Sequence, residues 1–162
     1  MKMIHRVAGA FSLLALSAAG TALADPNFPS VGTLMVSPPF GSLPVAAWSW
    51  GALNSGTIGG GSGGGAGKAT IQDLSVTRLV AGQSPLFFKV VATGDHLPTV
   101  ALADGPTTIT LTDVMITGYS TGDMPPGNSG TRTETITFSF EKVVYTVNGV
   151  TTCFNFTTNT SC

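Results

Sequence analysis

Charged side chains are scarce in this sequence. Only 9% of the 162 residues are charged, with 7 Lys and Arg against 8 Asp and Glu. A nucleic-acid-binding domain needs a basic patch, which this balance does not supply. A weakly charged surface rich in Thr, Ser and Gly repels its neighbours little and so permits self-association. It is equally typical of an ordinary secreted β-protein.

Histidine and cysteine are scarce too, which argues against catalysis. His96 is the only histidine after residue 24, so any nucleophile–base pair would depend on it. It follows Asp95 in a turn, where a histidine is usually structural or simply exposed. No calcium-binding DxDxDG spacing is present, and the sequence does not bring Asp113 together with Glu134 or Glu141. We therefore predict no enzymatic activity, no cofactor and no metal.

No apolar run that could span a membrane follows the first 24 residues, so stable membrane insertion is not expected. Residues 1–24 have the pattern of a secretory signal peptide. Lys2 and Arg6 form its basic end, Val7–Ala19 is apolar, and small residues precede a cleavage site between Ala24 and Asp25. The alternative is an N-terminal membrane anchor. We expect a secreted or periplasmic protein whose mature part, residues 25–162, is one domain.

The mature chain is predicted to be mostly β-strand, because Thr and β-branched residues dominate it. Prolines between residues 25 and 44 leave room there only for a short strand at Thr33–Val36. Alternating patterns indicate further strands at Lys68–Arg78, Val100–Ala103, Thr107–Tyr119 and Thr131–Val147. Together these strands predict an all-β barrel or sandwich.

Past Asp113 the apolar alternation changes phase, which predicts a bulge or a sharp bend within the strand at Thr107–Tyr119. Barrels need such bends at their corners.

One short helix is predicted between two of these strands. Ser84 suits its N-cap, Pro85 its first helical position, and Gly94 the left-handed residue after its last turn. Four apolar residues share one face of this helix and should pack on the sheet: Leu86, Phe87, Val90 and Val91.

Trp48 and Trp50 alternate with Ser49, so both indoles should point to one side of a strand. We expect them to pack in the core, and a ligand-stacking platform is the alternative. A glycine-rich loop follows at Gly51–Gly67, where nine of seventeen residues are Gly. It does not fit a nucleotide-binding P-loop, because Ala69 follows Lys68 where Ser or Thr is required.

Nine short segments, taken in order, carry a family resemblance: Ala47–Gly51, Asn54–Gly56, Gly63–Lys68, Gln72–Ser75, Ser84–Pro85, Ala92–Gly94, His96–Pro98, Ile109–Val114 and Arg132–Tyr145. None is specific alone, but the ordered series resembles the Hcp family, the haemolysin-coregulated tube protein of type VI secretion. The resemblance implies a small antiparallel β-barrel with one short α-helix. It also implies a non-enzymatic subunit of hexameric rings that stack into a tube and can carry small effector proteins.

The glycine loop is the candidate subunit contact. Residues without side chains let a neighbouring backbone approach closely, including by edge pairing. The glycines concerned are Gly59, Gly60, Gly61, Gly63, Gly64 and Gly65.

Residues 148–162 extend past the segments that resemble the family. Asn148-Gly149 predicts a tight hairpin, and alternating apolar residues follow it. Cys153 and Cys162 are the only cysteines, and behind a signal peptide they predict a disulfide. A bridge over so short a loop would stabilise this end by roughly 2.5–3 kcal/mol on the chain-entropy model.

The signal peptide does not fit a tube that polymerises in the cytoplasm. Two functions therefore stay open at this point. The first is a self-assembling ring or tube subunit. The second is a secreted or periplasmic Hcp-like binding module or fibre subunit that works independently of a secretion machine.

Overall fold

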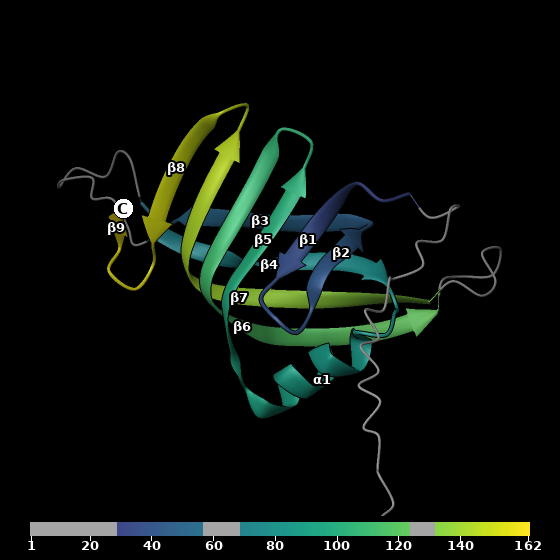
Figure 1. Cartoon of the computed structure of the whole chain (residues 1–162). Coiled ribbons are helices and arrows are strands. Elements are labelled where there is room, and N and C mark those ends of the chain that lie inside the picture. Colours follow the sequence, from purple (N-terminus) through teal and green to yellow (C-terminus); the bar gives the residue numbers. More distant parts are fainter. Residues whose placement is uncertain (1–28, 57–68, 124–131) are drawn as a thin grey trace, which may run out of the picture.

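The computed structural model describes residues 29–56, 69–123 and 132–162, which form one curled sheet with a helix against it (Figure 1). The predicted signal peptide and the Ala24–Asp25 cleavage site lie outside these residues. The elements in chain order are β1 Gly32–Val36, β2 Gly41–Val45, β3 Ala47–Asn54, β4 Ala69–Leu79, α1 Ser84–Thr93, β5 His96–Asp104, β6 Thr107–Asp123, β7 Arg132–Val147, β8 Val150–Asn155 and β9 Thr160–Ser161.

The strands lie in the order β2-β1-β5-β6-β7-β4-β3, with β8 beside β7 and β9 beside β8. Every pairing is antiparallel, which confirms the predicted all-β fold with one short helix. Among the described strands the ladder does not close into a complete barrel, because its two ends are β2 and β3. These strands are consecutive, and the chain crosses the opening at Ala46, whose N–H donates to the Thr77 carbonyl oxygen at 2.9 Å.

The hydrophobic core fills the inside of the curled sheet. Alternation along each strand sends every second side chain inward, and apart from Arg78 and Glu134 the fully buried strand residues are apolar. Those with no exposed surface include Leu34, Leu43, Leu74, Val100, Ile109, Ile136 and Phe138.

The predicted bend in the long strand is confirmed. Asp113 adopts the left-handed region at φ 50°. Leu111 and Val114 are buried on either side of it, so the inward face changes phase there. A bulge follows between Ile116 and Gly118. Together these features let β6 and its partner β7 belong to both halves of the curl (Figure 1).

The prediction of only one strand before residue 45 is wrong. β2 also forms there and contains Pro44, which pairs with Thr33 of β1. Proline is tolerated because β2 lies at the end of the ladder, so the outer side of this strand needs no donor.

The helix is confirmed, but its N-cap and packing face differ from the prediction. Gln83 rather than Ser84 is the N-cap, and the cap residue makes no side-chain hydrogen bond. Gly94 ends the helix at φ 71°, as expected. Phe87 is fully buried, but Leu86 is 37% exposed. The helix therefore rests on a narrower face than the apolar spacing suggested.

The C-terminal hairpin is confirmed. Asn148 and Gly149 have φ of 50° and 81°, as a two-residue hairpin turn requires, and β8 pairs with β7 beyond it. The structure joins Cys153 and Cys162 in a disulfide, with the Cα atoms 5.4 Å apart. Phe156 packs near Phe140, at 5.9 Å between ring centroids, so the extension adds to the core.

Candidate functional site

The two tryptophans lie on β3 and face the core, as predicted. Both are half-buried and pack against it. The Trp48 Nε1–H donates to Asp104 Oδ2 at 2.9 Å. Trp50 meets Tyr145 edge to face, at 5.3 Å between ring centroids. Their rings and the indole N–H of Trp48 are engaged within the protein, which favours packing over a ligand-stacking platform.

The candidate contact glycines Gly59, Gly60, Gly61, Gly63, Gly64 and Gly65 lie outside the described residues, but the strands on either side define where their loop starts and ends. β3 and β4 form a hairpin whose last pair is Asn54 with Ala69. β3 is the last strand of the ladder. It carries no charged side chain, and Leu53 near its end is 61% exposed. The loop thus leaves the sheet at an uncharged edge, where another chain could approach.

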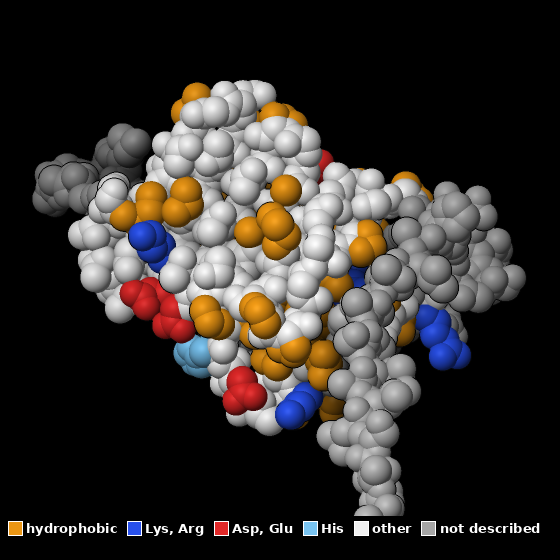
Figure 2. Space-filling view, in the orientation of Figure 1, with side chains coloured by type: hydrophobic (Ala, Val, Ile, Leu, Met, Phe, Trp, Pro, Cys, Tyr) orange, Lys and Arg blue, Asp and Glu red, His pale blue; other side chains and the backbone are white. Residues whose placement is uncertain are grey.

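A second apolar surface lies on and beside α1. Phe88 is 62% exposed, Leu86 37% and Val80 38%. Figure 2 shows hydrophobic side chains gathered over the helix in the lower part of the view. Phe88 packs edge to face against the Tyr119 ring, with 6.3 Å between the ring centroids. Leu86 and Phe88 are two positions apart on α1, so they flank the buried Phe87 on opposite sides. We call these two residues and Val80 the helix patch.

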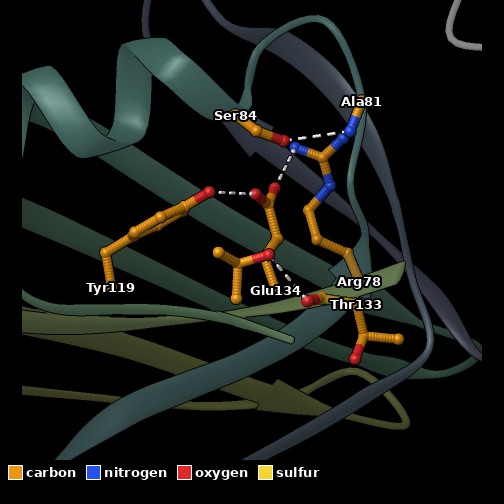
Figure 3. A network of polar contacts seen from close by, with 7 residues as sticks. Arg78, Ala81, Ser84, Tyr119, Thr133 and Glu134 are labelled. Atoms are coloured by element: carbon orange, nitrogen blue, oxygen red, sulfur yellow. Dashed lines mark hydrogen bonds and ion pairs between the residues drawn. The ribbon is translucent and has the colours of Figure 1, made fainter. Parts of the chain in front are cut away.

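Beneath α1 lies a buried ion pair that no sequence pattern predicts. Arg78 on β4 and Glu134 on β7 are each 1% exposed, with 3.1 Å between Arg78 Nη1 and Glu134 Oε1. The Tyr119 hydroxyl donates to Glu134 Oε2 at 2.9 Å (Figure 3). Burial lowers the pKa of Arg78, and the charge of Glu134 opposes that shift. Burial, followed by the bond to Glu134, raises the pKa of Tyr119.

This pair supports the helix above it. The guanidinium of Arg78 lies 5.8 Å from the centre of the Phe87 ring. Ser84 Oγ, at the start of the helix, accepts from the Ala81 N–H at 2.9 Å and fixes the preceding turn (Figure 3). Arg78 and Glu134 are register partners across β4 and β7. No local motif could have indicated that pairing, because it depends on which distant strands become neighbours.

The remaining candidates for chemistry are one exposed pair and two carboxylates bound to other partners. His96 Nδ1 lies 2.7 Å from Asp113 Oδ1, and both side chains are at least half exposed. Glu141 does not join this pair: its carboxylate accepts from the Asn155 amide at 2.9 Å. Glu134 forms an ion pair with Arg78. Across residues 29–56, 69–123 and 132–162, no group of three His, Cys, Asp or Glu side chains is placed to hold a metal. In the same parts of the chain, no helix is long and apolar enough to cross a membrane.

Comparison with known structures supports the fold. A type six secretion system protein of known structure matches with a TM-score of 0.74 at 20% identity, covering 83% of this chain and 100% of its own. Hcp1 from Salmonella typhimurium matches with a TM-score of 0.63 at 25% identity, covering 81% and 97%. A structure of the anti-feeding prophage baseplate shares the fold more distantly, with a TM-score of 0.51 at 13% identity over 74% and 93%.

Comparison of the sequence with family models identifies the family of the chain. A comparison with curated proteins finds no match. The model of the family described as "Type VI secretion system effector, Hcp" matches residues 40–147, about two thirds of the chain. That span runs from the turn before β2 to the end of β7 and includes α1. The chain therefore belongs to the Hcp family of type VI secretion.

Proposed function

We propose that this protein is a structural subunit that assembles into closed rings, and that the rings stack into a tube. The observation that carries the proposal is the family match over residues 40–147. It covers the helix and six of the strands, from β2 to β7, rather than one isolated motif. We infer a hexamer, because the family resemblance implies six-membered rings. A structural role also agrees with the placement of the remaining candidates for chemistry, since His96 and Asp113 form an exposed pair and Glu141 is bound to Asn155 instead.

The outer surfaces suit assembly. The β3 edge is uncharged and lies at the end of the ladder. The helix patch exposes apolar area that a neighbouring subunit could cover. With 9% of its residues charged, the chain has little like-charge repulsion to overcome on self-association.

We further propose that the subunit works after export, in the periplasm or outside the cell. Its first 24 residues have the pattern of a secretory signal, and a disulfide joins Cys153 to Cys162. Such bridges persist in oxidising compartments. Small effector proteins inside the ring are the partners implied by the family.

Negative-stain imaging of the purified chain beginning at Asp25 tests the ring. We expect closed rings with a central opening, some of them stacked. Images that contain only particles of one subunit's size would overturn the ring and favour a monomeric secreted binding module. Fibres without rings would favour a fibre subunit.

Shortening the glycine loop tests the proposed contact. Replacing residues 55–65 with a tight turn should weaken assembly. The protein concentration at which half of the subunits are assembled should rise about tenfold or more. The expected reason is that the loop orders against the next subunit, while the β3–β4 ladder that carries it stays paired. Light-scattering mass and thermal unfolding of both forms give the result. If the assembly mass is unchanged by the deletion, the loop is not part of the subunit contact. A lowered unfolding temperature would show that the loop stabilises the fold instead.

A further inference from the structure

The C-terminal end of the chain builds an unprotected strand edge. Val143–Cys162 contains no charged side chain. This segment forms the end of β7, all of β8 and all of β9. Among the described strands β8 has β7 on one side, and on the other it has only the two residues of β9, which pair with Phe154 and Asn155. The first part of β8 is thus an open edge.

The register shows which backbone groups face that edge. The two-residue turn at Asn148-Gly149 makes Val147 and Val150 a hydrogen-bonded pair. Bonded and non-bonded pairs alternate in an antiparallel ladder. The N–H and C=O groups of Thr151, Cys153 and Asn155 therefore point away from β7.

The β9 strand covers only part of this row. The Cys162 N–H donates to the Cys153 carbonyl oxygen at 3.4 Å, and Thr160 pairs with Asn155. Thr151 lies beyond the reach of both β9 pairs. Its backbone N–H and C=O are therefore the groups that a new strand would meet first.

The usual protections of an edge strand are missing here. Natural sheets guard their edges with charges, proline or bulges. The sequence Val150–Asn155 has no charge and no proline, and its pairing with β7 is free of register shifts. Within the described parts of the chain its only cover is β9, and two ladder pairs alone hold a strand weakly. The Cys153–Cys162 bridge is what fastens β9 in place.

We propose that this bridge is a clasp that controls strand addition at β8. When a dithiol reductant opens it, the S–S bond breaks, each sulfur gains one hydrogen, and the dithiol becomes a cyclic disulfide. β9 is released, and the outward groups of Thr151, Cys153 and Asn155 pair with a second copy of this chain. The inference goes beyond the proposed ring and does not require it.

A second copy is the occupant that fits best. A charged partner strand would find no opposite charge anywhere in Val143–Cys162. A second β8 brings the same uncharged side chains and the same free backbone groups. Two antiparallel β8 strands are related by a two-fold axis, which makes the contact self-complementary and closed.

The mature chain with Cys153→Ser and Cys162→Ser tests the clasp by light-scattering mass at matched concentrations. We expect its assembly mass to be about twice that of the oxidised wild type. The assembly mass of wild type treated with dithiothreitol should rise by the same factor. A double variant with the same mass as oxidised wild type would overturn the proposal. The comparison holds even if wild type is monomeric, so failure of the ring and failure of the clasp are distinguishable.

A third substitution identifies the edge. Adding Thr151→Pro to the double variant removes one outward N–H and leaves the bonds to β7 intact, because the Thr151 groups face away from β7. The mass should return to the wild-type value. Thr151→Lys, which places a charge on the edge, should act in the same way if the proline variant fails to fold. A mass that stays doubled in a folded Thr151 variant would place the contact elsewhere and overturn the proposal.

Discussion

Replacing Glu134 with Gln should lower the free energy of unfolding by about 3 to 5 kcal/mol, because removing one partner leaves the other charge buried and unpaired. Glu134 is 1% exposed, accepts the hydroxyl of Tyr119, and is paired with Arg78, which is equally buried. Chemical denaturation of wild type and variant, followed by circular dichroism, measures the loss.

Two further variants separate buried charge from lost packing. Arg78→Met combined with Glu134→Leu removes both charges and keeps apolar volume, so it should lose much less stability than Glu134→Gln alone. Asp113→Asn removes the carboxylate charge from the exposed pair with His96 and should cost under about 1 kcal/mol. If the double variant is less stable than Glu134→Gln, the ion pair itself stabilises the fold. The explanation by an unpaired buried charge would then be wrong.

Replacing Phe87 with Ala should cost about 3 to 5 kcal/mol, the range for deleting a buried aromatic ring. Phe87 has no exposed surface and stacks on Phe40 with 4.4 Å between ring centroids. Its loss removes the main apolar contact of α1 and the ring that faces Arg78.

The neighbouring aromatic residue provides a matched control. Phe88 lies on the same helix and is 62% exposed, so Phe88→Ala should cost less than about 1 kcal/mol of stability. It should weaken assembly instead if the helix patch is a subunit contact. Equal loss of stability in the two variants would mean that α1 does not depend on its buried face.

Local signals predicted much of this fold. Asn148-Gly149 fixed a hairpin, Gly94 ended the helix, and the phase change past Asp113 located the bend. Each depends on the backbone preferences of a few adjacent residues, or on a period that the sequence displays directly. The tryptophan pair followed from simple alternation.

Features that depend on distant neighbours were not predicted. Pro44 argued against β2, but tolerance of proline depends on which strands lie at the end of the ladder. Leu86 had the right spacing for the core, yet it is 37% exposed, because the helix buries a narrower face centred on Phe87. Arg78 and Glu134 are register partners although 55 residues separate them in the sequence. Sequence order does not determine such pairings until the strand order is known.

The mass of the mature chain in solution tests the central proposal most directly. Sedimentation equilibrium of protein beginning at Asp25, without reductant and over a wide concentration range, gives the number of subunits in the particle. A closed ring predicts one defined mass of six subunits, with higher multiples of six as rings stack. A mass of one subunit at every concentration would contradict the proposal that this Hcp-family chain is a ring-forming subunit.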